Sequence, residues 1–196
     1  MAVDAGGALR FHASMENREE IRALLALPLV ELAARADAVR ARHAPGRLDL
    51  CGIVNAKSGR CGEDCRFCAQ SARHRTGIPE HGLLARDELV RAAVAARANG
   101  AERFGIVTSG NCLAPAELDR VTEAIAAIRR EVDIALCASL GAVSVAQLGA
   151  LKQAGLSRYH HNIETAPGFF PRIVTTHSFA EREATVRAAQ EAGLEV

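Results

Sequence analysis

The sequence has neither a long apolar run nor a strong surplus of one charge. Its longest apolar stretch, residues 23–30, is interrupted by Pro28 and is far shorter than the ~20 residues that a membrane-spanning helix needs. The formal net charge is +1 at pH 7, whereas proteins that bind nucleic acid or anionic membranes carry a pronounced basic surplus. We therefore expect neither a membrane nor a nucleic acid as a partner.

A secretory signal is also lacking, because the first residues, MAVDAGGALRFHASMENREE, have neither a basic start nor an apolar stretch. We therefore predict a cytoplasmic protein. Disulfides are rare in that reducing compartment, so clustered cysteines there are metal ligands or redox groups. With 196 residues, of which 49% are hydrophobic and 24% are charged, the chain is long enough to bury one core.

Four of the six cysteines lie within 18 consecutive positions, and Cys61, Cys65 and Cys68 follow the spacing C-x3-C-x2-C. Three hypotheses explain this motif. A structural zinc site would need Cys51 or His74 as a fourth ligand, although the paired C-x2-C motifs typical of such sites are absent. A thiol redox site would use only Cys65 and Cys68. An iron–sulfur cluster would use all three cysteines and leave one iron open for a substrate or cofactor.

The hydrophobic pattern alternates between short apolar stretches and amphipathic segments. Residues 14–43 follow a helical period that Pro28 breaks, which predicts two short helices joined at Leu27-Pro28. Four apolar stretches after them predict β-strands at residues 48–54, 103–107, 134–138 and 158–163. Amphipathic segments predict four helices at residues 87–99, 115–130, 144–154 and 178–192.

Capping residues agree with the predicted ends of these helices. Ser144 and Ser178 lie at helix starts, and Glu181 completes a capping box with Ser178. Gly155 lies at a helix end. The repeat of strand and helix predicts a parallel sheet, either doubly wound or closed as a (β/α)8 TIM-type barrel. The sequence holds about five strand starts and four complete βα units, whereas a closed barrel takes roughly 250 residues. We therefore expect the N-terminal part of a barrel over residues 48–196, preceded by a helical extension over residues 1–47.

The cysteine motif, with Phe67 directly before its last cysteine, resembles that of the radical S-adenosylmethionine (SAM) superfamily. In that superfamily the amine and carboxylate of SAM chelate the fourth iron of a [4Fe-4S] cluster, so three cysteines suffice. The resemblance implies that Cys61, Cys65 and Cys68 hold the cluster and that Phe67 lies beside the adenine of SAM, although simple packing would also explain the aromatic residue. An electron passed through the cluster would cleave SAM to methionine and a 5′-deoxyadenosyl radical.

Four segments narrow the resemblance to the biotin synthase family: KSGRCGEDCRFCAQSARHRTG, ALCASLG, GLSRYHHNIETAPGFFPRIVTTHSFAEREAT and AAQEAGLEV. Together they cover nearly all of the sequence after residue 50, in the family's order. The resemblance implies a barrel enzyme, a radical SAM sulfurtransferase that inserts sulfur into dethiobiotin to form biotin. It also implies a flavodoxin-type electron donor and a homodimer.

The same resemblance implies roles for residues of YHHNIET and of the helix after it. Asn162 would lie between SAM and dethiobiotin, Glu164 would bind the SAM ribose in place of an aspartate, and Arg182 would pair with the SAM carboxylate, although a surface position would also explain Arg182. His160, where the family has an asparagine, would contact the substrate. If this segment continues a strand, His160, Asn162 and Glu164 point to one face. A ligand or internal hydrogen bonds would then offset the cost of their burial.

An auxiliary [2Fe-2S] cluster held by three cysteines and an arginine is also implied, but the chain departs from that pattern. Cys137 matches one cysteine ligand, whereas Gly105 stands where the family has another. We expect a variant cluster in which Cys51 replaces the missing ligand, with Cys112 as a weaker candidate. Alternatively, these cysteines are small buried apolar residues. Two other functions remain open, namely a radical SAM enzyme of the hydrogenase-maturase or mutase type and a zinc-stabilised module without catalysis.

Overall fold

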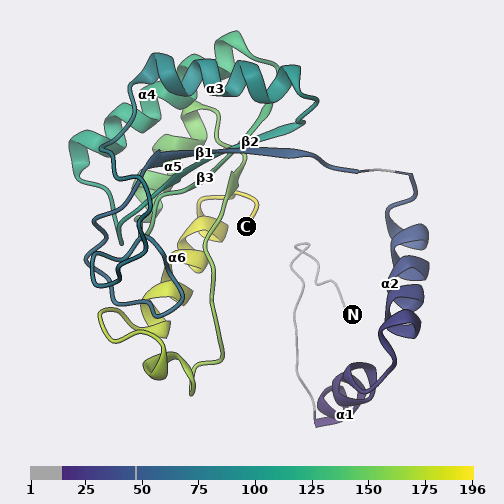
Figure 1. Ribbon diagram of the computed structural model, residues 1–196. Helices are drawn as coiled ribbons and strands as arrows, with labels where there is room; N and C mark the ends of the chain where they lie inside the picture. The colour runs from purple at the N-terminus through teal and green to yellow at the C-terminus, as the bar shows by residue number, and fades with distance from the viewer. Residues whose placement is uncertain (1–14, 47) are drawn as a thin grey trace. The chain divides into compact units, whose positions relative to one another are not determined.

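The computed structural model describes residues 15–46 and 48–196. These residues belong to two compact units, one ending at Leu48 and the other spanning Asp49–Val196. The first unit contains the two predicted helices, α1 (Met15–Leu25) and α2 (Leu29–His43) (Figure 1). Residues 1–14 and 47 of the predicted helical extension lie outside the described residues. Pro28 directly precedes α2, as expected of a residue that lacks an N–H and begins a helix more readily than it continues one.

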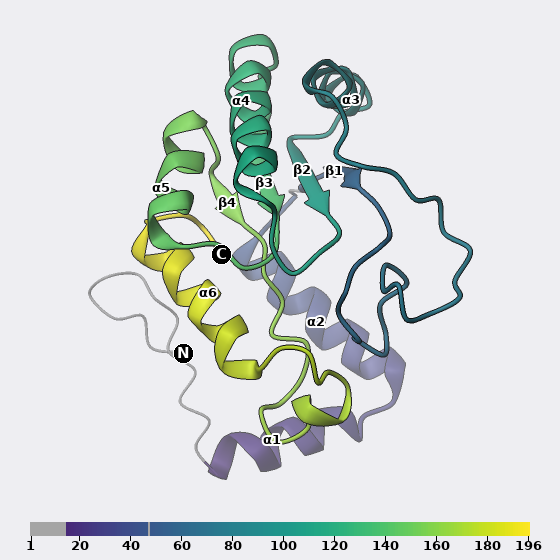
Figure 2. The ribbon, with the colours of Figure 1, turned by 90° about the vertical axis from the view of Figure 1, so that its left-hand side faces the viewer.

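The second unit contains a parallel sheet whose four strands are paired in the order in which they occur along the chain. They are β1 (Cys51–Lys57), β2 (Arg103–Thr108), β3 (Ala135–Ser139) and β4 (Arg158–Tyr159). The helices of this unit are α3 (Arg86–Ala98), α4 (Pro115–Glu131), α5 (Val145–Ala154) and α6 (Phe179–Glu191). Helices α3, α4 and α5 connect successive strands (Figure 2), so the predicted alternation of strand and helix is confirmed.

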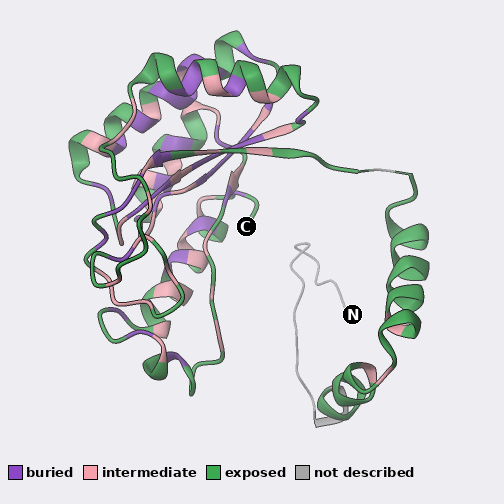
Figure 3. Cartoon of the chain, viewed as in Figure 1, coloured by how far each residue is buried: buried purple, intermediate pink, exposed green. Residues whose placement is uncertain are grey.

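The hydrophobic core lies between the sheet and helices α3–α5, where buried residues gather in Figure 3. Phe104 and Leu136 are 1% exposed, and each such burial stabilises the fold by about 1.5–3 kcal/mol. Helix α4 contributes the apolar stripe of the predicted amphipathic helix. The four residues of this stripe are buried: Leu118, Val121, Ile125 and Ile128. Because side chains alternate along a strand, every second strand residue points to the opposite face of the sheet.

That opposite face is less covered by the residues that the structure describes. Its side chains include that of Ile53, which is 68% exposed. Ile53 pairs in register with Gly105, and Gly105 pairs with Cys137, so these three residues form one row across β1, β2 and β3. This face is where the two cavities described below are found.

Strand β4 is shorter than the sequence predicts. The strand expected over residues 158–163 ends at Tyr159, and the last ladder bond runs from the His160 N–H to the Ala138 carbonyl oxygen at 2.8 Å. Glu164 then adopts a left-handed conformation with φ of 67°, which no regular strand accommodates. The expectation that His160, Asn162 and Glu164 lie on one face of a strand is therefore wrong.

The predicted helix caps are confirmed. Ser144 and Ser178 accept hydrogen bonds from the backbone N–H groups three residues later, and Glu181 completes the capping box of α6. Gly155 ends α5 in the left-handed conformation with φ of 118°, which glycine adopts without a steric cost. Among the described residues, no helix combines the length and the apolar character that crossing a bilayer requires.

The close approach of β1 to α3 gives a test of this packing. A Cβ atom on Gly52 would lie 2.7 Å from the Ala96 Cβ atom, whereas one on Gly149, inside α5, would contact nothing within 4 Å. We expect Gly52→Ala to lower the free energy of unfolding by about 1–3 kcal/mol through overpacking. Gly149→Ala should raise it by roughly 0.5–1 kcal/mol, because alanine favours a helix. Urea denaturation measures both, and equal effects of the two substitutions would contradict the packing described.

Candidate functional site

The three motif cysteines lie in the loop that follows β1 and line one cavity of about 220 Å³. Cys61 is buried, while Cys65 and Cys68 are partly exposed. The loop closes on itself, since the Cys61 N–H donates to the Gln70 carbonyl oxygen at 3.1 Å and the Ala72 N–H donates to the Cys61 carbonyl oxygen at 2.8 Å. Hydrogen bonds within the loop backbone thus bring the three cysteines close together, which their spacing in the sequence alone does not require.

The electrostatics of this cavity favour a bound cation or cluster. Burial, together with the neighbouring thiols of Cys68 and Cys61, raises the pKa of the Cys65 thiol to about 11. Three adjacent thiolates repel one another, so they need positive charge between them, as metal sites provide. Iron–sulfur clusters are held by such thiolates, and the cysteine loop therefore fits a cluster with three protein ligands.

A structural zinc ion fits this loop less well. In the described part of the chain, no three His, Cys, Asp or Glu side chains converge on a point where one ion could bind, whereas a [4Fe-4S] cluster offers a separate iron to each thiolate. His74, a proposed fourth zinc ligand, places its Nε2 atom 3.0 Å from the Cys65 carbonyl oxygen. Cys51, the other candidate, lines a different cavity.

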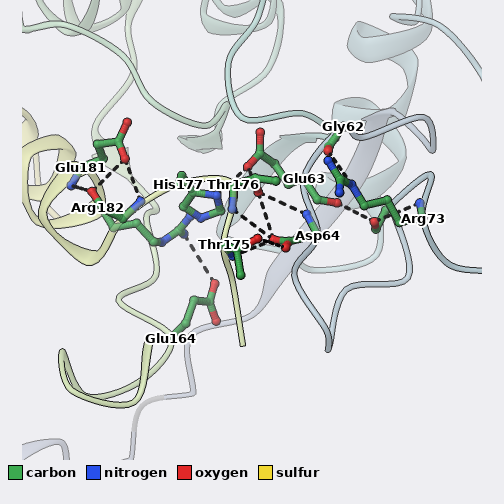
Figure 4. Close-up of polar contacts among 12 residues, drawn as sticks. Gly62, Glu63, Asp64, Arg73, Glu164, Thr175, Thr176, His177, Glu181 and Arg182 are labelled. Atoms are coloured by element: carbon green, nitrogen blue, oxygen red, sulfur yellow. Dashed lines mark hydrogen bonds and ion pairs between the residues drawn. The ribbon is translucent and has the colours of Figure 1, made fainter. Parts of the chain in front are cut away.

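The cysteine cavity also has polar and charged lining. Phe67, Glu164 and Arg182 line the same cavity as the cysteines, and the Arg182 Nη2 atom lies 3.5 Å from the Glu164 Oε1 atom (Figure 4). The Arg182 Nε–H also donates to the Asn162 carbonyl oxygen at 2.5 Å. Both charged side chains are partly shielded, with exposures of 15% for Arg182 and 22% for Glu164. The structure thus brings two of the sequence-predicted cofactor residues, Glu164 and Arg182, to the cavity of the cysteine loop, which itself carries Phe67.

Asn162 and His160 are placed differently. The His160 Nε2 atom and the Asn162 Oδ1 atom are 3.1 Å apart, so these side chains are engaged with each other. His160 lines the second cavity instead of the cysteine cavity. Asn162 contributes to the Arg182 contact only through its carbonyl oxygen.

Sequence reasoning missed His161, which lines the cysteine cavity together with Glu164 and Arg182. Burial, together with the charges of Arg182, His177 and His160, lowers the pKa of His161 to about 4. Its ring stacks on Tyr159 with centroids 6.3 Å apart. Strand alternation predicted that His161 points away from the site, so no signal in the sequence identified it.

The second cavity, of about 460 Å³, contains both cysteines proposed for the auxiliary cluster. Burial, together with the charge of Cys51, raises the pKa of Cys137 to about 11. Cys51 and Cys137 thus line the same cavity. A Cβ atom on Gly105 would lie 3.2 Å from the Cys137 Sγ atom, so glycine leaves room beside that thiol. Cys112 is exposed and lines neither cavity.

A disulfide between Cys51 and Cys137 conflicts with the sheet. Strand β2 lies between β1 and β3, so the two backbones are about 9.5 Å apart. A disulfide needs Cα atoms within about 7 Å. The two thiols can therefore share a bound group, but they cannot bond to each other without movement of the sheet.

Comparison with known proteins decides the family. The sequence model of the radical SAM superfamily matches residues 56–196, which is most of the chain. The chain belongs to the radical SAM superfamily. This membership implies a [4Fe-4S] cluster and SAM as cofactors.

Curated biotin synthases are similar to this radical SAM chain. That of Nitratidesulfovibrio vulgaris (strain DP4) is 53% identical over 179 residues, which cover 90% of this chain and 50% of the relative. That of Heliobacterium modesticaldum is 51% identical over 168 residues, which cover 86% of this chain and 51% of the relative. The chain thus spans about half the length of the curated relatives it matches.

Solved structures confirm the predicted fold class. A methylornithine synthase superposes with a TM-score of 0.76 at 21% identity, covering 90% of this chain and 52% of that one. The FeFe-hydrogenase maturase HydG from Carboxydothermus hydrogenoformans superposes with a TM-score of 0.70 at 23% identity, covering 81% and 37%. At such identities the similarity concerns the fold alone. The four-stranded sheet corresponds to part of the barrel-type fold of radical SAM enzymes.

The burial of His161 makes stability depend on pH. The folded pKa of His161, about 4, lies below the ordinary value of 6.5. Between these pH values the histidine is therefore protonated in the unfolded state and neutral in the folded state. The free energy of unfolding should therefore fall as pH is lowered from about 6.5 to about 4. We expect His161→Gln to weaken this dependence, and His43→Gln, in exposed surroundings, to leave it as in the wild type. Urea titrations at several pH values measure the slope, and an unchanged slope in His161→Gln would refute the assignment.

Proposed function

We propose that this protein uses radical SAM chemistry to insert sulfur into dethiobiotin, forming biotin. The observation that carries the proposal is the shared cavity of the three motif cysteines with Phe67, Glu164 and Arg182. The similarity to biotin synthases over 90% of the chain supports this substrate. Dethiobiotin, a flavodoxin-type electron donor, a homodimer and a cytoplasmic location remain predictions.

Cys61, Cys65 and Cys68 would hold the cluster through their sulfur atoms and leave one iron to SAM. When bound, the cluster and SAM would supply a carbon-centred radical that removes hydrogen from unactivated carbons. The protein's own part is to bind and orient. Arg182 would pair with the SAM carboxylate, since a guanidinium matches a carboxylate in two-pronged geometry. Glu164 can accept hydrogen bonds from ribose hydroxyls, and Phe67 would pack against the adenine.

The auxiliary cluster would be anchored by Cys51 and Cys137 in the larger cavity. Burial and mutual repulsion disfavour thiolates there, whereas the charges of Arg103 and Arg158 lower the pKa of Cys137. These two arginines would therefore help to offset the charge of a thiolate-bound cluster. The described residues of this cavity supply two thiols, which can anchor a cluster on one side.

The relation between the two cavities supports a substrate held between them. Val107 and Ser139 line both cavities, so the cavities adjoin across the ends of β2 and β3. His160 lines the larger cavity, and its partner Asn162 is held by Arg182, which lines the smaller one. We propose that His160 and Asn162 contact a substrate placed between the SAM cavity and the sulfur source.

A different radical SAM reaction, of the hydrogenase-maturase or mutase type, is the second candidate. The absence of a thiol at Gly105 favours it, because a usual ligand of the auxiliary cluster is then missing. Product analysis separates the two. Biotin formation from dethiobiotin supports the proposal, whereas SAM cleavage without biotin favours the second candidate.

The first prediction from this proposal concerns the motif cysteines. Cys65→Ala should abolish the [4Fe-4S] absorption after anaerobic reconstitution and abolish SAM cleavage, because it removes one of three protein ligands. Cys112→Ala is the matched control, since Cys112 is exposed, and it should retain both. Iron and sulfide content and the methionine released are measured. A cluster that persists unchanged in Cys65→Ala would disprove the assignment.

The second prediction concerns the cysteine pair of the larger cavity. Cys51→Ala and Cys137→Ala should each lower the iron content while SAM cleavage continues, and biotin formation should be lost. The reason is that the two cavities have separate cysteines. Iron analysis, methionine release and biotin yield are compared with those of the wild type. Full iron content in both variants would show that this pair holds no cluster.

A further inference from the structure

Two acidic residues within the cysteine motif bind a distant segment of the chain. Glu63 and Asp64 lie between Cys61 and Cys65, and they contact residues 175–177, which precede α6 (Figure 4). We call this set of contacts the acidic clasp, and its members are Glu63, Asp64, Thr175, Thr176 and His177. More than a hundred positions of sequence separate its two sides.

Asp64 forms the larger half of the acidic clasp. Its Oδ1 atom accepts hydrogen bonds from the Thr175 N–H at 2.8 Å and the Thr176 N–H at 3.2 Å, and its Oδ2 atom accepts one from the Thr175 hydroxyl. The Asp64 N–H in turn donates to the Thr176 hydroxyl oxygen at 3.2 Å. The bonds from Thr175 hold the pKa of Asp64 well below its usual range.

Glu63 forms the other half through His177. The Glu63 Oε2 atom lies 2.6 Å from the His177 Nδ1 atom, and the histidine side chain is only 3% exposed. Because a carboxylate can only accept, Nδ1 carries the hydrogen. The edge-on contact of the His177 ring with Phe170, at a centroid distance of 5.7 Å, fixes its plane. The Thr176 hydroxyl also donates to Glu63.

The acidic clasp joins the two sides of the cysteine cavity. A further bond, from the Arg66 N–H to the Ile173 carbonyl oxygen at 3.0 Å, continues the same seam beyond Cys65. On the far side, Ser178 caps α6 directly after His177, and Arg182 lies in the first turns of that helix. The loop that carries Cys65 therefore cannot shift without moving the segment that positions Arg182.

This connection matters because one ligand would have to contact both sides. If SAM binds the open iron and its carboxylate meets Arg182, the distance between loop and helix must suit a single molecule. Misplacement by about 1 Å can cost ~100-fold in such a site. The other contacts of the loop are local or lead to β1 and the segment after β2, such as the Ser109 hydroxyl to the Gly59 carbonyl oxygen at 2.8 Å. They do not involve α6.

We propose that the acidic clasp is a positioning device that sets the cysteine loop against Arg182, so that SAM binding depends on it and cluster assembly does not. This inference rests on the proposed radical SAM function. Asp64, Thr175 and Thr176 are positioning residues, because they act through the cysteine loop and Arg182, whereas Glu63 and His177 also line the cysteine cavity.

Three substitutions break the acidic clasp to different extents. Asp64→Ala removes all contacts of that carboxylate, whereas Thr175→Val removes only one hydroxyl and keeps the backbone bond. His177→Phe keeps the ring packing against Phe170 and loses the donor to Glu63. His177→Asn is its conservative partner, since the asparagine amide can replace Nδ1–H as the donor.

The control is an ion pair elsewhere in the same loop. The Arg60 Nε atom and the Glu80 Oε2 atom are 2.9 Å apart, and neither residue lines the cysteine cavity. Glu80→Ala therefore removes a contact of the cysteine loop without touching α6.

The experiment measures cluster content and SAM affinity separately in the anaerobically reconstituted protein. Iron and sulfide per chain report assembly, and the SAM-dependent change in the electron paramagnetic resonance spectrum of the reduced cluster reports binding. We expect wild-type iron content in every variant. The SAM dissociation constant should rise by about 10-fold or more in Asp64→Ala and His177→Phe, as loss of such outer contacts does at metal sites. The rise should be smaller in Thr175→Val, and His177→Asn and Glu80→Ala should resemble the wild type.

Two outcomes would overturn the proposal on its own. One is an unchanged SAM dissociation constant in both Asp64→Ala and His177→Phe. The other is a fall in iron content with normal SAM affinity per loaded cluster, which would make the acidic clasp a folding contact. A wild-type protein that assembles no SAM-responsive cluster would instead overturn the proposed function, and this inference with it.

Discussion

Parallel strand pairing is the constraint on which this structure depends. Because β1 to β4 run in the same direction and in chain order, the segments that follow them leave the sheet at one edge, where parallel α/β folds place their active sites. The cysteine loop follows β1, and the segment that leads to α6 follows β4. Without parallel pairing, Cys65 and Arg182 would have no reason to share a cavity.

The less covered face of the sheet gives this edge a second cavity. Gly105 has no side chain beside the Cys137 thiol, so the row formed by Ile53, Gly105 and Cys137 leaves space that a larger residue would fill. The resulting cavity adjoins the cysteine cavity at Val107 and Ser139. One sheet thus carries two neighbouring thiol sites, which suits a reaction that needs a radical source and a sulfur source close together.

Much of the fold was predictable because local patterns and tertiary packing agree. The stripe of α4, the caps at Ser144 and Ser178 and the break at Pro28 all appear where the sequence places them. The exception was the segment after Tyr159. Its alternating polar residues suggested a continued strand, but among the described residues β4 is paired on the side away from β3 only by a bridge of Arg158 with Glu195. Glu164 then turns left-handed, and His161 lines the cysteine cavity together with Glu164, while His160 lines the larger cavity.

The sequence by itself determined which cysteines form the site, because C-x3-C-x2-C is a local motif, and its resemblance to the radical SAM motif implied a cluster with three protein ligands. It also determined the order of strands and helices, since hydrophobic periodicity is a local property. Only the tertiary structure decided which distant residues meet. The contact of Glu63 with His177 and the shared cavity of Cys51 and Cys137 depend on the register of parallel strands and on loop paths. These are set by packing across the whole sheet and leave no local signal in the chain.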